Sequence, residues 1–208
     1  MRTEDSTLPI RSEKKVMRAK AIVFVLGALA ASGCVPDWAK QGDSPEVLLM
    51  TGINGGNPLT SDVRISNGSV CPDFASLRVE NHPKNPLVSG TGFRGDIVIE
   101  RYSVRYFRSD GRSTEGVDVP YAISGNVAQE IQEGSSAVLN LEVVRRQAKL
   151  EPPLRNLTAF GGGQVVTMFA EVTIHARSTV NQTTNTATAR LQIDFADFVD
   201  TLTACPSS

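Results

Sequence analysis

The clearest pattern in the chain is an alternation of apolar and polar residues in its last third. Apolar side chains recur at every second position through residues 166–176 and again through 187–195. This period of two belongs to a β-strand with one buried and one wet face, and a helix does not have it. The stretch 181–185 between the two runs is rich in Asn and Thr, which favours a turn. The sequence therefore predicts two long strands joined as an antiparallel hairpin.

Residues 97–108 predict another long strand with an irregularity inside it. Its apolar residues fall into two sets of opposite phase, Ile97 and Ile99 on one side and Tyr102, Val104 and Tyr106 on the other. We expect a β-bulge near Glu100, because one extra residue brings both sets to the same face. A strand that bends and packs both of its faces is the alternative.

Weaker patterns elsewhere are also typical of strands. We expect strands at residues 46–51, 63–66, 74–80, 116–123 and 137–146, a helical turn at 129–133, and loops at 52–61 and 152–163. In the strand at 137–146, the residues predicted to face the core are Ala137, Leu139, Leu141 and Val143. About eight or nine strands separated by turn signals predict an all-β chain folded as a two-sheet antiparallel β-sandwich. A barrel is the alternative.

The segment 102–106, followed by Asp110-Gly111, resembles the middle strands of fibronectin type III and immunoglobulin-like domains. This resemblance implies an immunoglobulin-like sandwich, which we place at residues 46–208. Two cysteines of this segment, Cys71 and Cys205, form an even pair, which predicts a disulfide bond in an oxidising compartment. Two separate thiols are the alternative. The predicted bond differs from the usual immunoglobulin pair, because Cys205 follows the last expected strand.

The N-terminal part has the layout of an export signal. Basic residues lead into the apolar run 21–31, which is too short to span a bilayer, and small residues follow it. We therefore expect residues 1–33 to be a cleaved signal peptide. Residues 1–16 are polar and of mixed charge, and they are either a long n-region or an extension upstream of a true start at Met17.

The stretch Ala31-Ser32-Gly33-Cys34 resembles the lipobox of bacterial lipoproteins, although that family favours Leu where Ala31 stands. The resemblance implies that Cys34 is lipidated and becomes the mature N-terminus. Because Val35 is not Asp, it implies the outer membrane as the anchoring site in a double-membraned host. Residues 34–45 would then form a lipidated tether. An ordinary secretory signal is the alternative.

The net charge and the small number of histidines argue against two classes of function, nucleic-acid binding and metal binding through histidine. Six of the 21 Lys and Arg and three of the 22 Asp and Glu precede Cys34, which leaves the exported part with a net charge of about −4. We expect no nucleic-acid partner, because that function needs a concentrated basic face. The two histidines, His82 and His175, are expected on the surface, and neither predicts a metal site.

The sequence contains no combination of residues that predicts catalysis. The segment 88–92 lacks the first glycine of a nucleophile elbow, and the glycines at 161–163 precede a strand, so they form no phosphate cradle. Asp62, Asp73, Asp110 and Asp118 lie in or near loops, and loop carboxylates could bind calcium. A second set recurs at every third residue: Asp194, Asp197 and Asp200. We expect the carboxylates of both sets to be solvated. We expect no enzyme activity and no cofactor.

Together these features predict a lipid-anchored envelope protein whose domain acts as a structural or protein-interaction module. Its partners would be the membrane, through the lipid, and an envelope protein or glycan. The alternative is a surface lipoprotein that binds glycan or calcium through loops at the end of the domain.

Overall fold

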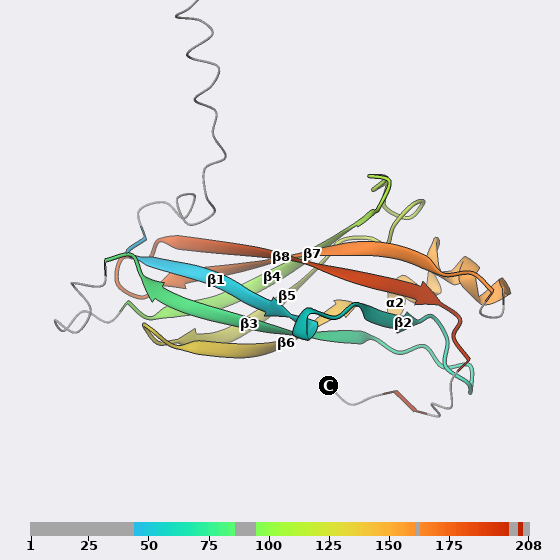
Figure 1. The fold of residues 1–208 in the computed structure, drawn as a ribbon, viewed down its shortest axis with the longest axis horizontal. Helices are drawn as coiled ribbons and strands as arrows, with labels where there is room; N and C mark the ends of the chain where they lie inside the picture. The colour runs from blue at the N-terminus through green and yellow to red at the C-terminus, as the bar shows by residue number, and fades with distance from the viewer. Residues whose placement is uncertain (1–43, 86–94, 161–162, 200–203, 206–208) are drawn as a thin grey trace, which may run out of the picture. The chain divides into compact units, whose positions relative to one another are not determined.

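The computed structural model of the chain describes residues 44–85, 95–160, 163–199 and 204–205, which lie within one compact unit, Asp37–Ser208. Within these residues the fold is all-β (Figure 1). The strands are β1 (Glu46–Ile53), β2 (Leu59–Asp62), β3 (Asp73–Pro83), β4 (Ile97–Arg108), β5 (Ile123–Ile131), β6 (Ser136–Val144), β7 (Val166–Ser178) and β8 (Thr184–Ala196). Short helical segments are η2 (Asn54–Gly56), α2 (Arg146–Leu150) and η3 (Leu154–Phe160).

These strands form two sheets. The smaller sheet has the order β1-β3-β6, and the larger has the order β2-β8-β7-β4-β5. An all-β chain with two sheets is therefore confirmed. The prediction of antiparallel pairing throughout is wrong at one edge, because β2 runs parallel to β8, with Leu59 opposite Ile193. No hairpin joins β2 and β8, so the connection between them does not force β2 to run antiparallel to β8.

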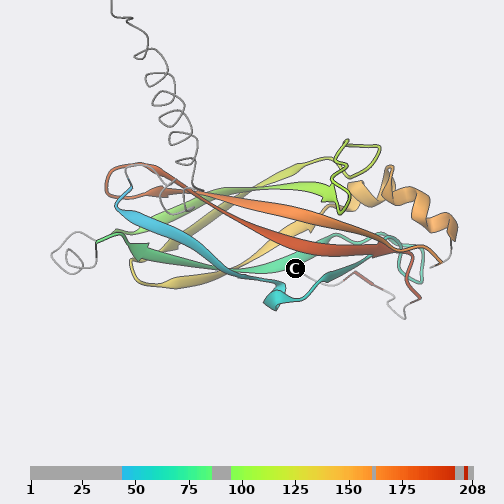
Figure 2. The same ribbon diagram turned by 45° about the horizontal axis from the view of Figure 1, so that its top comes forward.

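Because most pairing is antiparallel, the connections gather at two ends of the domain (Figure 2). We call one the entry end, because β1 begins there, with Glu46 opposite Pro83 at the end of β3. The start of β4 and the β7–β8 turn lie at the same end, since Ile97 pairs with Ser178. The opposite end, which we call the far end, holds the connections 63–72, 109–122 and 145–165.

Both sheets contribute to one hydrophobic core. Its fully buried side chains include Leu48, Leu77, Val79 and Val143 from the smaller sheet and Val104, Val172, Ile174 and Ile193 from the larger. Two tyrosines of β4 also reach the smaller sheet. The Tyr102 hydroxyl donates to the backbone oxygen of Glu142 (3.1 Å), and the Tyr106 hydroxyl donates to that of Val143 (2.6 Å). Each such hydrogen bond contributes about 0.5–1.5 kcal/mol.

The predicted β-bulge in β4 is confirmed. The register of β4 with both of its neighbours, β5 and β7, shifts between Ile99 and Arg101. After the shift the two apolar sets share the core face, and all five side chains are buried: Ile97, Ile99, Tyr102, Val104 and Tyr106. The bulge thus resolves the phase conflict without exposing either set.

The C-terminal hairpin is also confirmed, and so is the strand at 137–146 except for its last two residues, because β6 ends at Val144 and α2 begins at Arg146. β7 and β8 pair continuously, from Val166 opposite Phe195 to Arg177 opposite Thr184. In β6, Leu139, Leu141 and Val143 face the core, while Val138 on the other face is 66% exposed. Alternation therefore identified the buried face wherever one face meets the core and the other meets water.

Near residue 60 the prediction was wrong. The strand β2 (Leu59–Asp62) overlaps the end of the segment 52–61 that was expected to be a loop, and residues 63–66 form a turn instead of a strand. Val63 and Ile65 are nevertheless buried, with 0% and 3% exposure. The apolar pair that suggested a strand therefore packs into the core from a turn.

Three predictions between β4 and β7 were also wrong. Residues 116–123 are not the returning strand, and β5 takes that role and includes most of the expected helical turn at 129–133. β5 is an edge strand whose only buried side chains are Ile123 and Ile131, so it lacks an apolar alternation. The expected loop at 152–163 contains η3, which buries Leu154 and Leu157 three residues apart.

Candidate functional site

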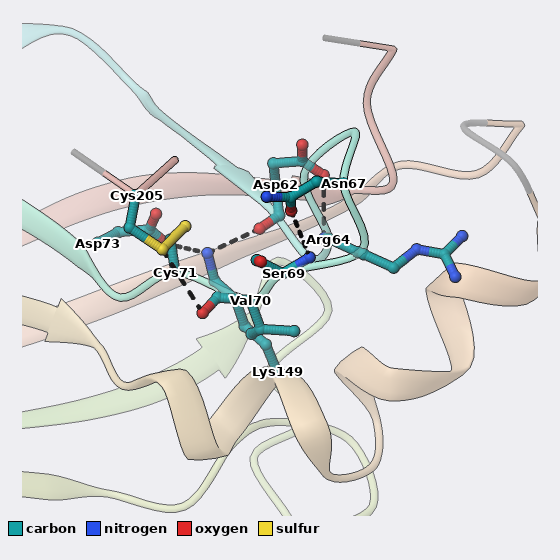
Figure 3. The surroundings of a disulfide bond; sticks show 9 residues. All are labelled: Asp62, Arg64, Asn67, Ser69, Val70, Cys71, Asp73, Lys149 and Cys205. Carbon is teal, nitrogen blue, oxygen red and sulfur yellow. Dashed lines mark hydrogen bonds and ion pairs between the residues drawn. A yellow bond between two sulfur atoms is a disulfide. The ribbon is translucent and has the colours of Figure 1, made fainter. Parts of the chain in front are cut away.

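The predicted disulfide lies at the far end of the domain (Figure 3). Cys71 and Cys205 are bonded, with their Cα atoms 5.3 Å apart and a sequence separation of 134. Cys71 is buried and stands two residues before β3 begins. The bond therefore ties the C-terminal segment, which follows β8, to the start of a strand in the other sheet.

A buried ion pair lies beside this bond (Figure 3). The side chain of Lys149, on α2, is 1% exposed, and its Nζ is 2.8 Å from Oδ2 of Asp73. Lys149 Nζ also donates to the backbone oxygen of Asp62 (2.7 Å), and the Ser61 hydroxyl donates to Asp73 Oδ2 (2.5 Å). We call Ser61, Asp73 and Lys149 the far-end cluster. It joins α2 to β2 and β3.

Burial dominates the electrostatics of the far-end cluster. Withdrawal from water raises the pKa of Asp73, while the charge of Lys149 and the hydrogen bonds from Lys149 and Ser61 act to lower it. The serine hydroxyl faces a carboxylate directly, without an intervening base, so the arrangement is not that of an activated nucleophile. The far-end cluster therefore holds α2, β2 and β3 together.

An open surface hollow adjoins the far-end cluster. Its rim carries an ion pair between Arg64 and Asp197 (3.1 Å). Asp62 fixes two of the lining residues, because its Oδ1 accepts hydrogen bonds from the backbone N–H of Arg64 (3.2 Å) and Phe198 (3.1 Å). The C-terminal segment is therefore fixed here by backbone contacts as well as by the disulfide.

A second polar cluster is buried at the entry end. Ser44 donates to Oε2 of Glu46 (2.7 Å), and Ser178 donates to Oε1 (3.0 Å). The amide nitrogen of Asn185 donates to the Ser44 hydroxyl (2.7 Å). Asn81 lies on the adjoining strand, and its amide nitrogen donates to the backbone oxygen of Gly95 (2.7 Å). We call Ser44, Glu46, Asn81, Ser178 and Asn185 the entry-end cluster. Ser44, predicted to belong to the tether, is thus part of the folded unit.

The face of the larger sheet that points away from the core carries a cross-strand array, which we call the outer face. Glu171 on β7 lies between Arg105 on β4 (3.0 Å) and Arg190 on β8 (3.1 Å). Hydrogen bonding to Arg105 is the largest of the effects that lower the pKa of Glu171. Phe107 and Phe169 stack with their centroids 5.5 Å apart, and the Arg190 guanidinium lies 5.1 Å from the centre of the Phe107 ring.

The two histidines lie on different sheets. His82 on β3 is 3.0 Å from Glu80, and His175 on β7 lies opposite Arg101 on the outer face. Burial, followed by the charge of Arg101, lowers the pKa of His175. The two side chains therefore do not converge on one site.

Most of the carboxylates singled out in the sequence have partners within the protein. Asp110 and Asp118 both bond to Arg112 in the β4–β5 connection. Asp194 accepts a hydrogen bond from Thr167 on the outer face (2.6 Å). Asp197 pairs with Arg64, whereas Asp194 bonds to Thr167, so these two acids do not share a partner.

Several predicted features lie outside the described residues. These are the lipidation site Cys34, the signal peptide 1–33, most of the tether 34–45, the segment 88–92 and Asp200. In the part that is described, no helix is long and apolar enough to cross a membrane. There is also no group of three or more His, Cys, Asp and Glu side chains there that could hold a metal ion.

Sequence reasoning missed Glu46 and Lys149. A signal for Glu46 was present, since it lies two residues before Leu48 and so on the core face of the same strand. Lys149 stands in a short polar segment and had no such signal. Comparison with known proteins adds no assignment, because no protein-family model matches the chain and no curated protein is similar to it.

Proposed function

We propose that the chain is a lipid-anchored protein of the cell envelope whose β domain acts as a non-catalytic structural or protein-interaction module. The order of basic residues, short apolar run and Ala31-Ser32-Gly33-Cys34 supports export and anchoring. Two or more acyl chains anchor a protein stably, because each buried methylene contributes about 0.8 kcal/mol. The disulfide between Cys71 and Cys205 is consistent with an oxidising compartment.

We further propose that the domain is an immunoglobulin-like sandwich. The order β1-β3-β6 corresponds to strands A, B and E of that fold, and β8-β7-β4 corresponds to G, F and C. β5 occupies the place of the added strand C′ beside C, as in variable-type domains. Such domains commonly serve as recognition modules, and this analogy supports the proposed role.

The outer face is the observation that carries the interaction role. Arg105 and Arg190 are 75% and 65% exposed and are held in register by Glu171. Exposed ion pairs add little stability, about 0.2–1 kcal/mol each, so their main effect is to fix the positions of the guanidinium groups. Arginine and aromatic side chains fixed in this way are typical of interface residues.

The anchor is tested by the mass of the protein purified from its native envelope. We expect the mature chain to begin at Cys34 and to carry acyl chains, and labelled palmitate to be incorporated. Cys34→Ala should lose the label and leave the membrane fraction. An N-terminus at any other residue, or membrane retention of the unlabelled variant, rejects the anchor.

The interaction surface is tested by photo-crosslinking in intact cells. A crosslinking residue at Thr173, on the outer face, is compared with one at Asn140, on the water-facing side of the smaller sheet. We expect a discrete adduct from position 173, which Glu171→Ala weakens because the arginines lose their fixed positions. Equal labelling from both positions, or none from either, contradicts the proposed surface.

A further inference from the structure

Buried polar side chains are concentrated at the entry end. Among the described residues seven polar or charged side chains are buried, and five of them make up the entry-end cluster. Each is at most 2% exposed. Polar groups withdrawn from water to this degree require partners that satisfy their charge and hydrogen-bonding capacity.

Within the described part of the chain, Glu46 forms no ion pair with a positively charged side chain. Its carboxylate accepts hydrogen bonds from the hydroxyls of Ser44 and Ser178. The far-end cluster is different, since its buried Asp73 faces Lys149. A carboxylate that is 1% exposed and lacks a counter-charge is costly to bury.

Two amide oxygens of the same cluster are also unsatisfied. Oδ1 of Asn81 and Oδ1 of Asn185 are buried, and neither accepts a hydrogen bond within the described part of the chain. The amide nitrogen of Asn81 is committed to the backbone oxygens of Gly95 (2.7 Å) and Ile131 (3.1 Å). Exchanging the oxygen and nitrogen of this amide would break both bonds, so the oxygen keeps its position. A buried acceptor left without a partner destabilises the folded state.

We propose that the entry-end cluster is a calcium-binding site. Its oxygens are the types that Ca²⁺ prefers: two from the carboxylate of Glu46, the amide oxygens of Asn81 and Asn185, and the hydroxyl of Ser178. One divalent cation supplies both the counter-charge for Glu46 and a partner for the amide oxygens. The set contains neither nitrogen nor sulfur ligands, which argues against zinc.

The site joins both sheets. Glu46 lies on β1 and Asn81 on β3 of the smaller sheet, while Ser178 and Asn185 lie on β7 and β8 of the larger. Gly95 closes one side, since a Cβ there would lie 2.7 Å from Oε1 of Glu46. With one carboxylate, the affinity belongs to the weak range of extracellular modules, about 10⁻⁴–10⁻³ M. Bound calcium therefore stabilises the end where the chain enters the domain, whatever the role of the outer face.

The test is thermal unfolding of the full-length protein, first in chelator and then in millimolar Ca²⁺ or Mg²⁺. We expect Ca²⁺ to raise the Tm by several degrees and Mg²⁺ to raise it less, because Mg²⁺ dehydrates reluctantly. Glu46→Gln should abolish the Ca²⁺-induced shift. Asn185→Asp should keep or enlarge it, since it adds a second carboxylate. Glu130→Gln, at an exposed position of β5, is the matched control and should leave it unchanged.

Titration calorimetry with Ca²⁺ alone gives an independent readout. A wild-type protein that shows neither a Tm shift nor binding heat overturns the proposal. An equal shift in wild type and Glu46→Gln also overturns it, because the ion then binds elsewhere. Should Glu46→Gln fail to fold, Asn185→Ala takes its place, and an unweakened Ca²⁺ response in that variant has the same meaning.

Discussion

Nζ of Lys149 lies 2.8 Å from Oδ2 of Asp73, and only 1% of the lysine side chain and 16% of the aspartate side chain are exposed. This ion pair links α2 to the start of β3, next to the bond between Cys71 and Cys205. Ser61 completes it with a hydroxyl donor. At the far end a disulfide and a buried ion pair thus link segments that are distant in the sequence.

Removing one member of this pair should be more harmful than removing both charges. We expect Lys149→Met to lower the free energy of unfolding by about 3–5 kcal/mol, because Asp73 is left buried without a counter-charge. Adding Asp73→Asn to that variant should restore part of the loss. Urea unfolding measures both effects. A double variant less stable than the single one would contradict this account.

The disulfide should account for a large part of the stability of the domain. Closing a loop of this length stabilises the folded state by about 4–5 kcal/mol in the chain-entropy model, since it restricts the unfolded chain. We therefore expect Cys71→Ser to shift the urea midpoint strongly downward, and reduction of the wild type to do the same. Cys34→Ser is the control and should leave the midpoint unchanged. A reduced wild type with an unaltered midpoint would refute the prediction.

Gly125 on β5 should not tolerate a methyl group. A Cβ at this position would overlap the ring of Tyr102, whose hydroxyl bonds across to β6. We expect Gly125→Ala to destabilise the protein by about 1–3 kcal/mol, because the ring must move. Gly52→Ala is the matched control, since its nearest contact would be an ordinary 3.9 Å from Arg78. Similar losses in the two variants would show that the Tyr102 ring is not the cause.

The buried hydroxyl of Tyr106 should make the stability sensitive to alkali. Burial raises the pKa of Tyr106 above its ordinary value of 10.0. The folded state therefore holds this proton more tightly than the unfolded state, and its contribution to stability falls as the pH rises above about 10. Tyr106→Phe should cost about 0.5–1.5 kcal/mol at neutral pH and reduce the decline in alkali. The control is Tyr121→Phe, at a position that is 54% exposed. A decline of unchanged steepness in Tyr106→Phe would count against this assignment.

The sequence indicated the disulfide and one member of the far-end cluster, and it indicated no member of the entry-end cluster. The cysteines were paired correctly, because only Cys71 and Cys205 remain when Cys34 is set aside, and two cysteines allow a single pairing. Asp73 was noticed only as one of several loop acids, and Lys149 and Glu46 were missed. Whether a charged side chain is buried depends on which distant segments pack over it, and a single sequence does not encode that in any local pattern.

The same distinction holds for the fold. The sequence by itself determined β6, the β7–β8 hairpin and the bulge near Glu100, because in these strands each residue's polarity follows directly from the face on which it lies. Only the tertiary structure decided β2, β5 and η3. The edge strands β2 and β5 each form hydrogen bonds with a single neighbouring strand and bury few side chains. The helix η3 lies in the connection between β6 and β7 and buries two leucines. The structure of these segments depends on strand pairing and burial against residues that are distant in the sequence. A local periodicity of apolar residues contains no information about such pairing or burial.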